Sequence, residues 1–370
     1  MQKLPVYMLK PNMVVAENIL DYNRRLILEK GTVLTEALIN RLFANQIISI
    51  TVEDKLFGTN SDVKAASQTG SGPEPSPREP SFSERVRSSK EFKVFQENYN
   101  TGVTHFRSYL NDIVQRNATV DVSVMLEDSL NLISSTKGSF HVLDMLQNMR
   151  DYDDDTYAHS MNVALICNVL ATWKNFSKHE TELATACGLL HDVGKLTIPP
   201  EIIRKPSKLS PIEYQKIRTH PQEGYAILQK LHVDQHIQNA ALMHHERMDG
   251  SGYPLNLRGK SIDRYAALVA IADVYDAMTA KRVYREALCP FEVIQIFEQE
   301  GFQRYETEFL LPFLENVVNT YIQNQCLLSD GRVATIIYVN REHLSRPTVQ
   351  CAEGFIDLSA HPELKIVRLL

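Results

Sequence analysis

The sequence predicts a mainly α-helical protein with a small α+β domain at its N-terminus and a short β appendage at its C-terminus. Three observations predict this fold class. Apolar residues recur with a helical period between about residues 82 and 320. Runs with a strand-like composition occur before residue 57 and after residue 321. Residues 67–80 are rich in Ser, Gly and Pro and carry no large apolar side chain, which is typical of a linker.

A chain of 370 residues is long for a single hydrophobic core, so we expect more than one domain. The bounds that we predict are a small N-terminal α+β regulatory domain at 1–57, a disordered linker at 58–81, connecting helices at 82–149, a helical domain at 150–320 and the β appendage at 321–370.

Within the N-terminal domain we expect short strands at 13–16 and 25–28, a turn at Gly31, a helix through 37–43 and a closing strand at 47–52. This part of the sequence shows no cluster of metal ligands and no phosphate-binding glycine motif. A docking or regulatory module is therefore the better interpretation of it.

The helical part contains one strong start signal. Ser210-Pro211-Ile212-Glu213 combines a cap residue, a proline at the first helical position and the glutamate of a capping box. We expect His220 near the far end of the helix that begins there. Further helices are predicted at 82–114, 122–135 and 140–149, and strands of the C-terminal appendage at 331–339, 348–351 and 365–369.

Composition limits the class of protein. The formal net charge of −6 argues against a non-specific polynucleotide binder, which would normally present a basic surface. The five cysteines are scattered and form no Cys-x-x-Cys pair, which is typical of reduced cytosolic thiols. No apolar run is long enough to span a bilayer, and the first residues lack the apolar core of a signal peptide. We therefore expect a cytoplasmic protein.

The most informative stretch is Leu189–Lys195, in which His191 and Asp192 end an apolar segment and Lys195 follows three residues later. One nitrogen and two oxygens suit first-row divalent metals, and the carboxylate of Asp192 could bridge two of them. The ammonium group of Lys195 adds a positive charge of the kind that a phosphate-binding site needs.

Other candidate ligands recur in the helical region. They are His159, His220, His244, His245 and Asp273. Burying so many polar groups without partners would cost roughly 1–3 kcal/mol each, and coordination of a shared metal cluster removes most of that cost. Because a single zinc takes three or four protein ligands, seven candidates indicate two ions. Oxygen ligands are present and thiolates are absent, so iron or manganese fits better than zinc.

A second motif completes the pattern. His244-His245-Glu246-Arg247-Met248-Asp249-Gly250-Ser251-Gly252-Tyr253-Pro254 joins a histidine pair to a glycine-rich turn. Together with the His-Asp stretch, it resembles the HD-GYP subgroup of the HD phosphohydrolase superfamily. The resemblance continues through Lys205-Pro206, the segment carrying His220, the run from Asp273 to Thr279 and Arg282-Val283-Tyr284-Arg285, over roughly residues 150–315. The N-terminal domain is similar to the small domain that precedes many HD-GYP domains.

The resemblance implies an all-helical HD-type, metal-dependent phosphodiesterase of bacterial second-messenger signalling at 150–320. Such enzymes open cyclic di-GMP to pGpG, and sometimes to GMP, through attack of a metal-bridging hydroxide. It implies that Asp192 and Lys195 are catalytic, and that Lys195, Arg282 and Arg285 bind the substrate phosphates. The implied metal ligands are His159, His191, Asp192, His220, His244, His245 and Asp273. The Gly252-Tyr253-Pro254 loop would shape the site or dock a protein partner.

Asp155 decides between two subtypes. Members of the family with three metals carry an acidic residue at this place. Asp155 precedes His159 by four residues, so both could share a helical face and bind a third ion. The alternative is that Asp155 only caps the helix and complements its dipole.

Three alternatives concern the function. The substrate could be 3′,3′-cGAMP instead of cyclic di-GMP, or another phosphoester. The protein could also be a non-catalytic cyclic-dinucleotide sensor, although such relatives would be expected to lose metal ligands and none of the seven is missing here. The amphipathic helices after the linker are compatible with a homodimer, and equally with packing on their own domain.

Overall fold

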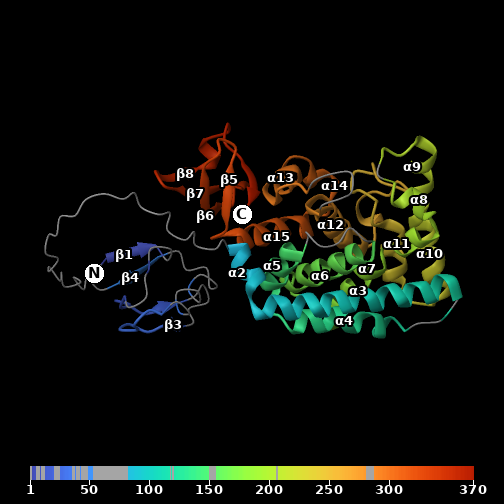
Figure 1. Cartoon of the computed structure of the whole chain (residues 1–370), viewed down its shortest axis with the longest axis horizontal. Helices are drawn as coiled ribbons and strands as arrows, with labels where there is room; N and C mark the ends of the chain where they lie inside the picture. The colour runs from blue at the N-terminus through green and yellow to red at the C-terminus, as the bar shows by residue number, and fades with distance from the viewer. Residues whose placement is uncertain are drawn as a thin grey trace, which may run out of the picture. The chain divides into compact units, whose positions relative to one another are not determined.

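The protein is described from a computed structural model that consists of two compact units, Met1–Arg78 and Glu79–Leu370 (Figure 1). Each unit is described by itself. The structure describes residues 82–116, 118, 121–149, 156–205, 207–280 and 287–370 of the second unit, and residues 2–5, 9, 13–20, 26–35, 38, 42 and 49–52 of the first. The linker predicted at 58–81 lies outside the described residues.

The first unit contains two antiparallel strand pairs in its described part. Strand β1 (Gln2–Pro5) pairs with β4 (Ser49–Val52), and β2 (Ile19–Leu20) pairs with β3 (Leu26–Leu28). The strand predicted at 13–16 is reduced to isolated bridges. The predicted turn is present, with Gly31 at φ +85°. Most of the helix predicted at 37–43 lies outside the described residues.

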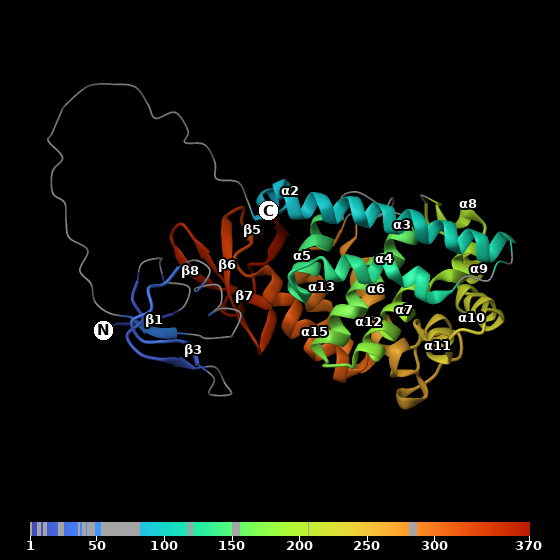
Figure 2. The same cartoon turned by 90° about the horizontal axis from the view of Figure 1, so that it is seen from below.

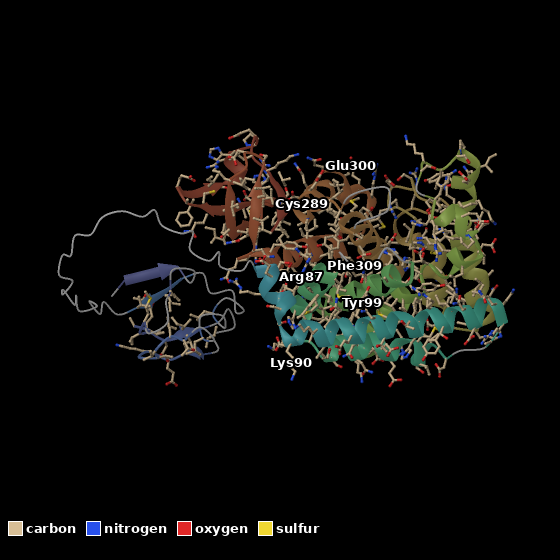
Figure 3. All side chains as sticks on the ribbon, in the orientation of Figure 1. Arg87, Lys90, Tyr99, Cys289, Glu300 and Phe309 are labelled. Atoms are coloured by element: carbon tan, nitrogen blue, oxygen red, sulfur yellow. The ribbon has the colours of Figure 1, made fainter. Side chains whose placement is uncertain are left out.

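The second unit begins with four helices: α2 (Phe82–Ser88), α3 (Lys90–Arg116), α4 (Val122–Ser134) and α5 (Ser139–Met149). The long helix α3 buries one stripe of large apolar side chains at helical spacing, from Phe92 through Phe106 to Ile113. The Tyr99 hydroxyl, on this stripe, lies 2.6 Å from Asn162 Oδ1 and 3.1 Å from the Ala158 carbonyl oxygen (Tyr99 is labelled in Figure 3). This contact fixes α3 against the central helix of the unit.

The central helices are α6 (Thr156–Trp173), α7 (Lys178–Leu190), α11 (Gln235–Met243) and α12 (Arg264–Thr279). Helices α6 and α12 are apolar on nearly all sides, as expected of helices that neighbours surround. A methyl group on Gly188 of α7 would lie 2.9 Å from both Ala164 Cα and Cys167 Sγ, so this glycine lets α7 approach α6 closely. None of the described helices is long and apolar enough to cross a membrane.

A short 3-10 helix (Val193–Thr197) follows α7, and α8 (Pro200–Ile203), α9 (Pro211–Ile217) and α10 (His220–Lys230) come next. Helix α9 starts with the predicted capping box of Ser210 and Glu213. The expected position of His220 near the end of this helix is wrong, because α9 ends at Ile217 and His220 opens α10. Pro221 has no N–H for an α-helical bond, so it favours the start of a new helix here.

The chain closes with α13 (Pro290–Ile296), a π-helical turn (Phe297–Gly301), α14 (Phe302–Arg304), α15 (Thr307–Val317) and a 3-10 helix (Val318–Tyr321). A five-stranded antiparallel sheet follows in the order β8-β7-β6-β5-β9. Its strands are β5 (Gln325–Leu328), β6 (Val333–Asn340), β7 (His343–Cys351), β8 (Gly354–Asp357) and β9 (Ile366–Leu369).

The C-terminal sheet confirms the predicted β character of this end, and it lies at one end of the helical bundle beside α13 (Figure 2). It is joined to the bundle closely. Buried sheet residues such as Ile336 and Val349 belong to the same hydrophobic core as the helices. The carboxylate of Glu298, in the π-helical turn, accepts a hydrogen bond of 2.7 Å from the Leu344 amide of β7. The sheet is therefore part of the same packed unit as the helices and shares their hydrophobic core.

Candidate metal centre

The structure brings the five predicted histidines and two predicted aspartates to one place. They come from the first turn of α6, the end of α7, the start of α10, the end of α11 and the middle of α12. Six of them are buried and His245 is partly buried; the seven are His159, His191, Asp192, His220, His244, His245 and Asp273. Residues more than one hundred positions apart thus share a small polar space within an apolar core.

Asp192 lies in the middle of this cluster, with its two oxygens facing opposite sides. Asp192 Oδ2 is 3.3 Å from His191 Nε2 and 3.7 Å from His159 Nε2. Asp192 Oδ1 is 3.3 Å from His220 Nε2 and 3.7 Å from His244 Nε2. One carboxylate therefore belongs to two groups of ligands, which is the geometry required of a bridge between two ions.

Each group contains enough further donors for an ion of its own. On one side, His159, His191 and Asp273 offer ligand atoms that all lie within 4.8 Å of one another. On the other side, His220, His244 and His245 do the same. With the Asp192 oxygen added, each group supplies four protein ligands, which matches the usual coordination number of zinc and leaves room for water on larger ions.

Backbone carbonyls fix the orientation of three rings. The Nδ1–H groups of His191, His220 and His244 donate to the carbonyl oxygens of Gly188 at 2.6 Å, Ile217 at 2.7 Å and Ala240 at 3.0 Å. A carbonyl oxygen can only accept, so the hydrogen is on Nδ1 and Nε2 is left to face the centre. This is the outer hydrogen bond that metal-binding histidines usually make.

Several buried lone pairs in the cluster lack a hydrogen-bond donor, and a cation would satisfy them. His191 Nε2 and Asp192 Oδ1 accept no hydrogen bond within the described part of the chain. His220 Nε2 and His244 Nε2 face each other at 3.2 Å, although the neutral forms of both rings carry their hydrogen on Nδ1. Two such lone pairs repel, and a buried unsatisfied group costs about 1–3 kcal/mol. The donor set therefore fits divalent metal ions.

The electrostatics of the cluster favour the metal-binding forms of most ligands. Burial and the neighbouring His191 lower the pKa of His244 to about 3, which keeps its imidazole neutral. Burial raises the pKa of Asp192, but Lys195 and His191 outweigh it and hold this pKa well below the usual range. Metals bind neutral imidazole and ionised carboxylate, so these two ligands need no proton change before binding.

Asp276 also contacts the cluster, and the sequence interpretation assigned it no role. Its Oδ2 accepts a hydrogen bond of 2.7 Å from His159 Nδ1, while His159 Nε2 lies 3.0 Å from Asp273 Oδ1. Burial lowers the pKa of His159, but these two carboxylates outweigh it and raise the pKa to about 9. Asp273 and Asp276 are three residues apart, so both lie on one face of α12. This spacing could have indicated from the sequence that Asp276 lies near the cluster.

Asp276→Ala should lower the affinity for metal by about 10–100-fold, because His159 loses the partner that orients its ring. Asp276→Asn keeps an acceptor oxygen and should lose less than the alanine variant. Competition with a chelator of known affinity measures the change. An alanine variant that holds metal as tightly as the wild type would show that Asp276 plays no part in the centre.

Lys195 lies at the edge of the cluster, where its ammonium Nζ is 2.5 Å from Asp192 Oδ2 and its side chain is 24% exposed. The approach of this segment to α10 depends on Gly194. A methyl group there would lie 2.0 Å from the His220 carbonyl oxygen and 2.5 Å from the Gly224 amide nitrogen. Glycine therefore allows Asp192 and His220 to meet.

The loop after the histidine pair closes over His245. The Tyr253 ring stacks on the His245 ring with centroids 4.6 Å apart and an angle of 25° between the planes. The buried carboxylate of Glu246 accepts backbone hydrogen bonds from Leu255 at 2.6 Å and Leu257 at 3.0 Å, and so holds the loop in place. The sequence interpretation predicted a site-shaping loop and did not find the role of Glu246.

Three predicted site residues, Asp155, Arg282 and Arg285, lie outside the described residues. Their roles stay predictions, and so does the choice between two and three ions that depends on Asp155.

Comparison with known proteins shows a similarity to one domain family. Residues 131–309 match the model of the HD domain family, a range that contains the whole cluster. This match extends over just under half of the chain and bears out the predicted resemblance at the level of the HD domain.

Two curated relatives give the comparison more detail. A 3′3′-cGAMP-specific phosphodiesterase of Vibrio cholerae is 39% identical over 145 residues, which are 39% of this chain and 34% of the relative. A cyclic di-GMP phosphodiesterase of Pseudomonas aeruginosa is 31% identical over 207 residues, which are 55% of this chain and 50% of the relative. The chain thus matches between a third and a half of the length of these relatives.

Among solved structures, an HDG"Y"P protein from Bdellovibrio bacteriovorus is similar at 18% identity and a TM-score of 0.46, covering 84% of this chain and 97% of that one.

Proposed function

We propose that the protein is a metal-dependent phosphodiesterase that hydrolyses a cyclic dinucleotide, with cyclic di-GMP as the expected substrate and pGpG, and further GMP, as the expected products. The observation that carries the proposal is the position of Asp192, whose two oxygens lie near two adjoining groups of buried donors. Paired metal sites of this kind are a recurring apparatus for hydrolysing phosphoesters.

We infer that two ions bind, one with His159, His191 and Asp273 and one with His220, His244 and His245, and that Asp192 serves both. Iron or manganese suits this mixture of imidazole and carboxylate better than zinc. When bound, such ions acidify a water molecule and neutralise the oxygens of a phosphate. A third ion at Asp155 is a further prediction for a residue outside the described part.

The side chains of the chain itself have distinct tasks in this proposal. Asp192 contributes one oxygen to each of the two ligand groups. Asp276 orients the His159 ring by accepting a hydrogen bond from Nδ1. Lys195 is cationic, partly exposed and next to Asp192, so its ammonium group can stabilise negative charge on the phosphoryl oxygens. Arg282 and Arg285 stay the predicted contacts of the remaining substrate phosphate.

The relatives support the reaction more strongly than the substrate. One is named for 3′3′-cGAMP and another for cyclic di-GMP, so 3′,3′-cGAMP is the second candidate. A non-catalytic sensor remains a weaker alternative, because all seven predicted ligands are present and brought together. A cytoplasmic location, a homodimer and a protein partner at the Gly252-Tyr253-Pro254 loop stay predictions.

Hydrolysis of cyclic di-GMP, 3′,3′-cGAMP and cyclic di-AMP by the metal-loaded protein, followed by chromatography of the products, tests the proposal. Lys195→Ala should lower kcat by about 10²–10³-fold, the usual cost of removing one group that stabilises the developing charge. Its metal content should stay near that of the wild type.

Lys230→Ala is the matched control, because Lys230 is an exposed lysine at the far end of α10. An unchanged kcat in the Lys195→Ala protein would contradict the role of this residue. An absence of hydrolysis of every cyclic dinucleotide by the wild type would contradict the proposed activity.

A further inference from the structure

Arg218, at the C-terminal cap of helix α9, contacts the loop that covers the metal centre. Tyr214 and Arg218 are four residues apart, at the middle and at the C-terminal cap of α9, so they share a face. The guanidinium carbon of Arg218 lies 4.4 Å from the centroid of the Tyr253 ring. The Tyr253 ring in turn stacks on His245, so the order of layers outward from the centre is His245, Tyr253 and Arg218.

Tyr214 belongs to the same rim. It precedes Arg218 by one helical turn on α9, so the two side chains leave the helix on the same face. The Tyr214 side chain is large and 51% exposed. An exposed aromatic ring thus lies on the same face of α9 as Arg218, which contacts the loop over His245.

Arg218 carries a charge that the described protein does not neutralise. Within the described residues, no carboxylate forms an ion pair with its guanidinium group, whereas Lys195 and Lys205 on neighbouring segments each have an acidic partner. The contact with the Tyr253 ring holds the guanidinium group in place, and no hydrogen bond within the described residues uses its N–H donors. The face of α9 therefore offers a flat cation with free donors and an aromatic ring.

These features match one kind of ligand group. A purine base has a flat π surface that stacks on aromatic rings and on guanidinium planes. The O6 and N7 acceptors of guanine match the donor fork of arginine. A phosphate would need only positive charge, and it would gain nothing from the exposed Tyr214 ring.

We propose that Tyr214 and Arg218 form a subsite for a purine base of the cyclic dinucleotide, next to the metal centre. This inference rests on the proposed function and deepens it. The subsite contributes to substrate selection, and the chemistry takes place at the ligand cluster beneath His245. Because Arg218 can donate to O6 and N7, the subsite favours guanine over adenine.

The test compares a substrate with bases and one without. Arg218→Ala and Tyr214→Ala should each lower kcat/KM for cyclic di-GMP by about 10-fold or more, the scale of losing one stacked base. Hydrolysis of bis(4-nitrophenyl) phosphate, whose rings lack the O6 and N7 acceptors of guanine, should fall much less. Tyr214→Phe keeps the ring and should restore most of the loss.

Arg218→Lys separates a base contact from a phosphate contact. Lysine keeps the charge and loses the plane and the fork, so this variant should lose nearly as much as Arg218→Ala. Recovery of the wild-type kcat/KM by lysine would assign Arg218 to a phosphate and overturn the base subsite. Lys216→Ala is the charge-matched control, since Lys216 is exposed on α9 and points away from the shared face of Tyr214 and Arg218.

Binding of a phosphorothioate analogue of cyclic di-GMP to the metal-loaded protein, measured by calorimetry, keeps this inference separate from the proposed activity. Weaker binding in the Arg218→Ala protein supports the subsite even if the wild type hydrolyses no cyclic dinucleotide. Wild-type hydrolysis with unchanged constants in both alanine variants overturns the subsite and leaves the activity intact. An equal loss on both substrates also overturns it, because Arg218 would then act through His245.

Discussion

Asp192→Ala should abolish hydrolysis, with a loss of at least about 10³-fold in kcat, and should lower the metal content of the purified protein. The reason is geometric. Both ligand groups face the same carboxylate, so its removal takes one oxygen from each group. It also removes the negative charge that the two groups share. The loss should therefore exceed that from any single histidine.

The helical fold should survive this change, because the surrounding apolar core does not depend on the carboxylate. Far-UV circular dichroism and mass spectrometry of the bound metals provide the two readouts beside activity. Asp112→Ala is a matched control, since Asp112 only pairs with Arg116 at the surface, at 2.8 Å. Wild-type turnover in the Asp192→Ala protein would overturn the assignment of the centre.

Gly194→Ala is the second substitution with a large expected effect, although it removes no ligand. The new methyl group would lie 2.0 Å from the His220 carbonyl oxygen, which is backbone and cannot rotate away. Overpacking of this kind usually costs about 1–3 kcal/mol, and here the start of α10 must move away from Asp192. We expect a lower melting temperature and loss of the metal held by His220.

Gly224→Ala is the control for Gly194→Ala. It tests whether the loss comes from the backbone clash at Gly194 or from replacing any glycine between this segment and α10. A methyl group on Gly224 would lie 3.2 Å from the Gly194 amide nitrogen and 3.5 Å from Ala241 Cβ, so it needs only a small adjustment. Alanine also has the higher helix propensity. Equal melting temperatures and metal contents in the two variants would contradict the role of Gly194.

The convergence of the seven candidate ligands could be predicted from the sequence because the signal lies in residue type. Histidines and aspartates within otherwise apolar helices need polar partners, so they gather in one place, and their role as metal ligands stays a prediction. Asp276 was harder to assign, because its role depends on which face of α12 meets the His159 ring. Glu246 was harder still, since its partners are backbone amides nine and eleven residues further along.

The fold class was also predictable from periodicity, and its exceptions have physical causes. The helix predicted to carry His220 ends early, because Pro221 favours a new start. Strands β5 and β8 were not predicted. Each has only four residues, and their pairing depends on partners elsewhere in the sheet. Local patterns report such short strands poorly.

The most direct test of the central claim is the product of cyclic di-GMP after incubation with the metal-loaded wild-type protein, identified by liquid chromatography with mass detection. The account predicts linear pGpG, and GMP on longer incubation, with formation that stops when a chelator removes the metal. Intact cyclic di-GMP in the presence of protein that holds its full complement of metal would contradict it.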